Sequence, residues 1–172
     1  MSPTLKSVVV PVTEVPQEDF VAHREKRKPL VLVVDDERVI ADTLSAILSR
    51  SGFATMAAYD GASALALAKN RTPDLLISDV MMPGMTGIEL AITIKQTIPA
   101  CKILLFSGQA ATVDLLEKAR HDGHDFTTLT KPVHPTDMLR RISECLGTKT
   151  SFQSFPNSAT QEHSAAVTVL PN

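Results

Sequence analysis

Residues 75–87 have the sequence L-L-I-S-D-V-M-M-P-G-M-T-G, an apolar run followed by a loop. Its apolar start is typical of a short buried strand, and Asp79 ends that strand before a loop too rich in turn formers to continue it. An earlier apolar run, residues 30–34, ends in the same way at Asp35 and Asp36. Carboxylates therefore stand where two separate strands are expected to stop.

Two later apolar runs also end in polar groups. Ser107 follows the fourth run, and Lys131, placed before Pro132, follows the fifth. If the strands are parallel, all of these side chains meet at one edge of one sheet, which is where open α/β folds place their sites.

The chain between residues 29 and 147 alternates strand-like and helical patterns. Strand-like runs begin near Leu30, Phe53, Leu75, Lys102 and Phe126, and a helical period follows each of them. Such alternation requires crossover connections, and hence a parallel sheet covered by helices on both faces. We predict an α/β protein with a doubly wound (βα)5 fold of the flavodoxin-like type.

Length and composition limit the possibilities further. The 172 residues, 44% hydrophobic and 21% charged, suit one ordinary core. We expect a flexible leader over 1–28, the folded domain over 29–147 and a disordered tail over 148–172. Cys101 and Cys145 lack metal-binding spacing, so we expect buried, reduced thiols.

Charge and hydropathy indicate the kind of partner. A formal net charge of −2 gives no global reason to bind nucleic acid or an anionic membrane, so a protein partner is expected. No apolar stretch approaches the about 18 residues of a membrane span, and the N-terminus lacks the pattern of a signal peptide. We therefore predict a cytoplasmic location.

Asp35, Asp36 and Asp79 together suggest a metal. Three carboxylates at one sheet edge repel each other, and either protonating one of them or binding a hard cation relieves the repulsion. Mg²⁺ is the obvious cation, because it prefers a few carboxylates with waters and a phosphate oxygen. The plainer alternative is that Asp35 and Asp36 form a turn and an N-cap for a helix from Glu37, and that Asp79 only begins a loop. A lysine at a third strand end favours the site.

The ordered motifs resemble a known family. V-L-V-V-D-D-E, D-L-L-I-S-D-V-M-M-P-G-M-T-G, L-L-F-S-G and L-T-K-P-V, over about residues 29–147, are similar to those of the receiver domain of two-component response regulators. The resemblance implies a five-stranded parallel sheet of order 2-1-3-4-5. Nothing after Gly147 can supply a helix-turn-helix, so we expect a stand-alone module without a DNA-binding output domain.

The resemblance also assigns roles. Asp79 would accept a phosphoryl group from a sensor histidine kinase or a histidine phosphotransfer protein. Asp35 and Asp36, with Asp79 and the backbone carbonyl of Met81, would hold Mg²⁺.

The remaining roles concern the switch. Ser107 would be the switch hydroxyl, Gly108 would leave room for a phosphoryl oxygen, and Lys131, in a cis bond to Pro132, would pair with the phosphoryl group. A downstream protein would bind the face made by the fourth helix, fifth strand and fifth helix, where two copies could also pair. The domain would assist its own phosphorylation and dephosphorylation without being an enzyme in the usual sense.

One position departs from the family pattern. The family usually has Tyr or Phe three residues before the lysine, whereas this chain has Thr128, with Phe126 two residues earlier. Either Phe126 substitutes through a shifted strand, or the coupling from Ser107 to the partner face is weak.

Two other functions and several weaker sites are alternatives. A phosphohydrolase that uses an aspartyl-phosphate usually has a second acid two residues after the nucleophile, where this chain has Met81. A docking surface that ignores phosphate is a further alternative. His121 and His124 could suggest a metal site, but a hydrophilic loop explains them better. Met81, Met82 and Met85 form either a soft rim for a partner helix or loop packing.

Overall fold

A computed structural model describes residues 27–108 and 111–148 of the chain. It contains five strands, β1 Leu30–Val34, β2 Ala54–Ala58, β3 Leu75–Asp79, β4 Lys102–Ser107 and β5 Thr127–Thr130. A helix follows each strand: α2 Arg38–Arg50, α3 Gly61–Asn70, α4 Gly87–Thr97, α5 Ala111–His121 and α6 Pro135–Leu146. The expected leader and tail lie almost wholly outside the described residues.

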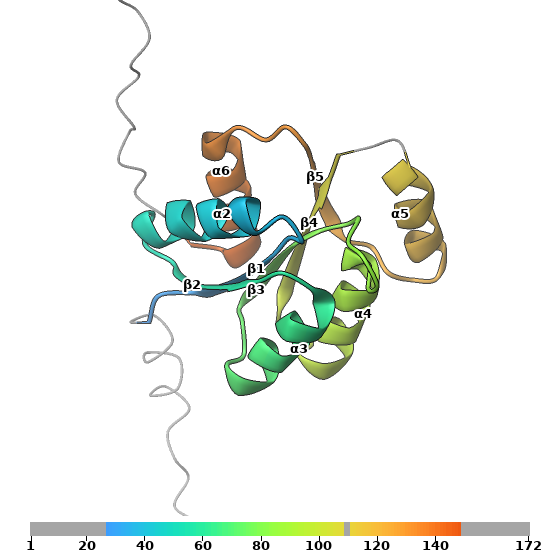
Figure 1. Cartoon of the computed structure of the whole chain (residues 1–172), viewed down its shortest axis with the longest axis horizontal. Coiled ribbons are helices and arrows are strands. Elements are labelled where there is room, and N and C mark those ends of the chain that lie inside the picture. Colours follow the sequence, from blue (N-terminus) through green and yellow to red (C-terminus); the bar gives the residue numbers. More distant parts are fainter. Residues whose placement is uncertain (1–26, 109–110, 149–172) are drawn as a thin grey trace, which may run out of the picture.

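The strands form one parallel sheet in the order β2-β1-β3-β4-β5 (Figure 1). The predicted doubly wound fold is therefore confirmed, including the order of its strands. Two strands begin one residue later than the pattern suggested, at Ala54 and Thr127. These are the two edge strands, where one flank has no neighbour to fix the boundary.

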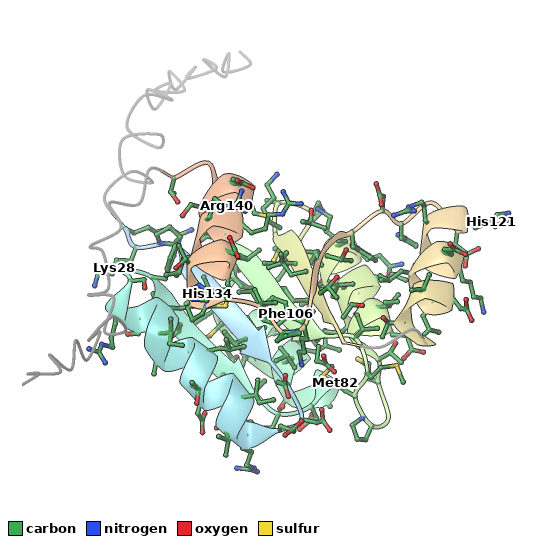
Figure 2. All side chains as sticks on the ribbon, turned by 90° about the horizontal axis from the view of Figure 1, so that it is seen from above. Lys28, Met82, Phe106, His121, His134 and Arg140 are labelled. Atoms are coloured by element: carbon green, nitrogen blue, oxygen red, sulfur yellow. The ribbon has the colours of Figure 1, made fainter. Side chains whose placement is uncertain are left out.

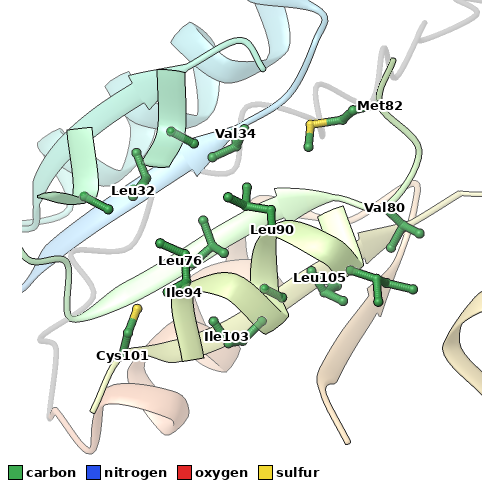
Figure 3. Close-up of a cluster of buried hydrophobic side chains, with 14 of the residues drawn as sticks. Leu32, Val34, Leu76, Val80, Met82, Leu90, Ile94, Cys101, Ile103 and Leu105 are labelled. Carbon is green, nitrogen blue, oxygen red and sulfur yellow. The ribbon is translucent and has the colours of Figure 1, made fainter. Parts of the chain in front are cut away.

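Alternate residues of the central strands divide between two cores. In β1, Leu32 and Val34 face one cluster with side chains of α3, α4 and α5, whereas Val31 and Val33 face another with side chains of α2 and α6. Figure 3 shows the first cluster, which includes Leu76 of β3, the register partner of Leu32 in β1. Because helices cover both faces, all five residues of β1 are buried.

Local signals explain where several helices begin and end. His134 caps α6, because its Nδ1 accepts a hydrogen bond from the N–H of Thr136 at 3.3 Å, and Pro135 occupies the first helical turn. Gly147 ends α6 with a left-handed φ of 63°. No helix within the described part of the chain is long and apolar enough to cross a membrane.

Candidate functional site

Strand register brings the polar strand ends to one edge of the sheet. Val34 pairs with Ser78, and Asp79 pairs with Phe106, so the ends of β1, β3 and β4 are level. The edge continues to β5, where the N–H of Lys131 donates to the carbonyl of Ser107 at 2.8 Å. The structure therefore brings together side chains from four separate strand ends.

Lys131 joins two of the predicted carboxylates directly. Its Nζ lies 3.1 Å from Asp35 Oδ2 and 2.8 Å from Asp79 Oδ1. The Asp35 side chain is 3% exposed and that of Asp79 is 13% exposed. Two largely buried carboxylates, one just after β1 and one at the end of β3, thus share one ammonium, which offsets part of their repulsion.

The protonation of Lys131 follows from the same contacts. Burial lowers the pKa of Lys131, but the hydrogen bonds and charges of Asp79 and Asp35 outweigh burial and raise the pKa above its ordinary value. Lys131 is therefore a fixed positive charge at neutral pH. Such a charge suits an anion bound beside Asp79.

The backbone around Asp79 is held tightly. Oδ2 of Asp79 accepts the N–H of Met81 at 3.1 Å, and the Asp79 carbonyl accepts the hydroxyl of Ser78 at 2.9 Å. A Cβ added to Gly87 would come within 1.9 Å of that carbonyl, so this position requires glycine. Gly87 was not among the predicted site residues, although its place at the end of the M-M-P-G-M-T-G loop was a signal.

Asp35 and Asp36 are placed differently. Asp35 is 2% exposed and its Oδ1 accepts the N–H of Glu37 at 3.0 Å, while Asp36 is exposed. The turn considered as an alternative is therefore present, although Glu37 is the N-cap and α2 begins at Arg38. The turn and a metal site are compatible, because only one oxygen of Asp35 serves the turn.

The donors at this edge fit a hard cation held partly by water. Across residues 27–108 and 111–148, no three His, Cys, Asp or Glu side chains gather closely enough to hold an ion alone. Asp35 and Asp79 are bridged by Lys131 instead. The carboxylate oxygens of Asp35 and Asp79 are of the kind that Mg²⁺ accepts, since this ion prefers oxygen ligands and usually keeps several waters.

Ser107 is held by the helix that follows it. Its Oγ lies 2.5 Å from Oγ1 of Thr112, in the first turn of α5. Thr112 is buried, at 1% exposure. A Cβ on Gly108 would make only ordinary contacts with the Lys131 side chain, at 3.6 and 3.7 Å. The contact with Thr112 could not be predicted from the sequence, because it depends on how the end of β4 and the start of α5 meet in space.

The structure places Thr128 and Phe126 apart from the Ser107 hydroxyl contact. Thr128 is exposed in β5, and Phe126 precedes that strand. The Phe126 ring is partly buried against the α3–α5 core and stacks on His124 with 6.1 Å between ring centroids. Phe126 thus packs at the base of β5.

The weaker candidates are accounted for by packing and turns. His121 lies at the outer end of α5 and is exposed (Figure 2). Of the loop methionines, Met82 is buried and Met85 packs against Gly61, whereas Met81 is 46% exposed. Cys101 is buried and Cys145 is half-buried, and both are free thiols.

Comparison with known proteins agrees with this architecture. The family model of the response regulator receiver domain matches residues 31–143. The probable transcriptional regulatory protein TcrX of Mycobacterium tuberculosis (strain ATCC 25618 / H37Rv) is 34% identical over 116 residues, 67% of this chain and 49% of that protein. The transcriptional regulatory protein YrkP of Bacillus subtilis (strain 168) is 35% identical over 125 residues, 72% of this chain and 52% of that protein. The chain thus spans about half the length of these curated relatives.

Solved structures show the same fold. Chemotaxis protein CheY4 of Vibrio cholerae superposes with a TM-score of 0.63 at 30% identity, covering 70% of this chain and 100% of that one. The signal receiver domain of an HD domain-containing protein from Pseudomonas fluorescens Pf-5 gives 0.65 at 31% identity, covering 70% and 96%. With the family match over 31–143, these findings show that the chain belongs to the response regulator receiver domains of two-component systems.

Proposed function

We propose that Asp79 accepts a phosphoryl group from a sensor histidine kinase or a histidine phosphotransfer protein, and that the modified domain signals by binding another protein. The observation that supports this best is the contact of one ammonium, that of Lys131, with both Asp79 and Asp35 at the site edge. A receiver domain generally works with such phosphodonors and binds Mg²⁺ in its acidic pocket.

The transfer is a simple displacement. An oxygen of Asp79 attacks phosphorus, the nitrogen–phosphorus bond of the donor histidine breaks, and its electron pair stays on the imidazole. The ammonium of Lys131 then balances negative charge on the transferred group, and the Ser107 hydroxyl donates a hydrogen bond to a phosphoryl oxygen. Mg²⁺, held by Asp35, Asp36, Asp79 and the carbonyl of Met81, would offset the charge of the phosphoryl oxygens when bound.

The signal arises because the group adds about −1.5 to −2 charges at the sheet edge. Ser107 and Lys131 are drawn toward it, and the surface of α5, β5 and α6 shifts between two arrangements that a downstream protein distinguishes. The same surface is a candidate for pairing of two copies. The proposal includes slow self-dephosphorylation and a cytoplasmic location.

The test is chemical labelling of the full chain. Incubation with Mg²⁺ and a small phosphodonor should give a base-labile phosphoryl adduct in the wild type and none in Asp79→Asn. Asp114→Asn, which makes the same change at an exposed carboxylate on α5, should label like the wild type. Full labelling of Asp79→Asn would refute the assignment. Equal affinity of a partner for labelled and unlabelled protein would favour a docking surface that ignores phosphate.

A further inference from the structure

The hydroxyl pair of Ser107 and Thr112 links the site edge to α5. Their oxygen atoms lie 2.5 Å apart, and Thr112 is only 1% exposed. Ser107 ends β4, whereas Thr112 lies in the first turn of α5. A group at the site edge is therefore joined by one hydrogen bond to a helix of the proposed partner surface.

Helix α5 is held more lightly than its neighbour. Among the described side chains of α5, only Thr112 and Ala119 are buried, and Val113 is 50% exposed. Helix α4, in contrast, has five buried residues, Gly87, Ile88, Leu90, Ala91 and Ile94. Figure 1 shows α5 at the outer side of the molecule. A helix with so few buried side chains can shift with little disturbance of the core.

The usual aromatic route is not in place here. Thr128 occupies the expected aromatic position and is exposed, and the Phe126 ring is engaged by His124 and the core. The contact that the structure does give to the Ser107 hydroxyl is Thr112. A movement of Ser107 therefore acts directly on α5 through this contact.

We propose that Thr112 is a positioning residue that transmits the movement of Ser107 to α5 in place of an aromatic side chain. A serine oxygen can donate one hydrogen bond and accept two, so Ser107 can donate to a phosphoryl oxygen while it accepts from Thr112. Because Thr112 is buried, water cannot readily replace Ser107 as its hydrogen-bond partner. The first turn of α5 therefore moves when Ser107 moves. This inference rests on the proposed phosphorylation of Asp79.

The test measures amide hydrogen exchange of α5 in the full chain, with Mg²⁺, before and after saturation with beryllofluoride as a phosphoryl mimic. Thr112→Val keeps the shape and removes the hydroxyl, and Thr112→Ser keeps the hydroxyl. Thr128→Val makes the same chemical change at an exposed threonine. Loss of the hydrogen bond to Ser107 should weaken the exchange response of α5 by about 2- to 10-fold in Thr112→Val. Thr112→Ser and Thr128→Val should respond like the wild type.

The outcomes separate this inference from the proposed function. If the wild type binds no beryllofluoride, the proposed function is wrong and this inference is wrong with it. If beryllofluoride binds and α5 of Thr112→Val responds as fully as in the wild type, only this inference is overturned. Should Thr112→Val fail to fold, Ser107→Ala removes the same bond from the other side. A full α5 response in Ser107→Ala, saturated with the mimic, would also overturn it.

Discussion

At the scale of the residue, Lys131 determines the charge balance of the site. Its ammonium contacts one carboxylate that is 3% exposed and another that is 13% exposed, and it is itself 29% exposed. A divalent ion bound at this edge would be attracted to the same oxygens as this ammonium. Lysine and metal would then compete in part, and each would substitute for some of the other's stabilisation.

Lys131→Met should lower the free energy of unfolding by about 1–3 kcal/mol without Mg²⁺, because Asp35 loses a charged partner while it stays buried. Added Mg²⁺ should recover more stability in this variant than in the wild type. Urea denaturation with and without Mg²⁺ measures both effects. Lys69→Met, at an exposed lysine of α3, is the matched control and should change neither. An equal effect of Mg²⁺ on Lys131→Met and wild type would contradict the competition.

Gly87→Ala should be costly because the new Cβ would meet the Asp79 carbonyl at 1.9 Å, and backbone on both sides must move. We expect the free energy of unfolding to fall by about 1–3 kcal/mol, and we expect slower phosphorylation of Asp79 by a small phosphodonor. Gly108→Ala is the control, since its Cβ meets only Lys131 at 3.6 Å. It should change stability by no more than about 0.5 kcal/mol. Equal stabilities of the two variants would show that the Gly87 contact relaxes freely.

At the scale of the element, α4 and α5 are built for different purposes. Helix α4 starts with a capping box, in which Thr86 Oγ1 accepts the Glu89 N–H at 3.2 Å and Glu89 Oε2 accepts the Thr86 N–H at 2.8 Å. Backbone and side-chain hydrogen bonds from Thr86 lower the pKa of Glu89. The capping box fixes the first turn of α4, and with it Gly87 beside the Asp79 carbonyl. Helix α5 has fewer buried side chains and can shift more easily.

Thr86→Ala should remove the capping box and lower the free energy of unfolding by about 0.5–2 kcal/mol. Thr86→Ser keeps an accepting hydroxyl and should retain most of the stability. Thr97→Ala, at the other end of the same helix, should change stability by about 0.5 kcal/mol or less. Thermal and urea unfolding of the three variants measure this. A loss in Thr97→Ala as large as in Thr86→Ala would mean that the cap is not the cause.

The elements themselves were predictable because strand and helix periods alternate clearly between Leu30 and Leu146. The central strands are continuous apolar runs, which parallel sheets require. The edge strand β5 is harder to delimit from the sequence, because its residues alternate between half-buried and exposed and do not form a continuous apolar run. We expected β5 to begin near Phe126, but it begins at Thr127, and the Phe126 side chain packs against the core cluster that includes side chains of α3, α4 and α5.

At the scale of the whole molecule, parallel strands explain why the site could be located from the sequence. Any polar residue at a carboxyl end reaches the same edge, so Asp79, Ser107 and Lys131 could be grouped without coordinates. What could not be derived is how neighbours meet there. Three features depend on crossover geometry. Two acids share Lys131, the Asp79 carbonyl leaves no room for a side chain at Gly87, and Ser107 contacts Thr112.

The packing of the whole molecule also sets how stability depends on pH above neutrality. Cys101 is 1% exposed in the core shared by α3, α4 and α5, and burial raises the pKa of its thiol to about 11. An unfolded chain loses this proton at about pH 8.5, whereas the folded protein keeps it. The folded state then binds one more proton, so the free energy of unfolding should fall by about 1.4 kcal/mol per pH unit through that interval.

Urea denaturation at several values between pH 8 and pH 10, where Lys131 stays protonated, measures the slope. Cys101→Ala should be less stable at pH 7 because of the lost core atom, but its stability should depend much less on pH in that range. Cys145→Ala is the matched control, and because Cys145 is only half-buried it should keep most of the wild-type slope. If Cys101→Ala and wild type show the same slope, the thiol ionises in the folded protein as readily as in the unfolded chain, and the core around it admits water.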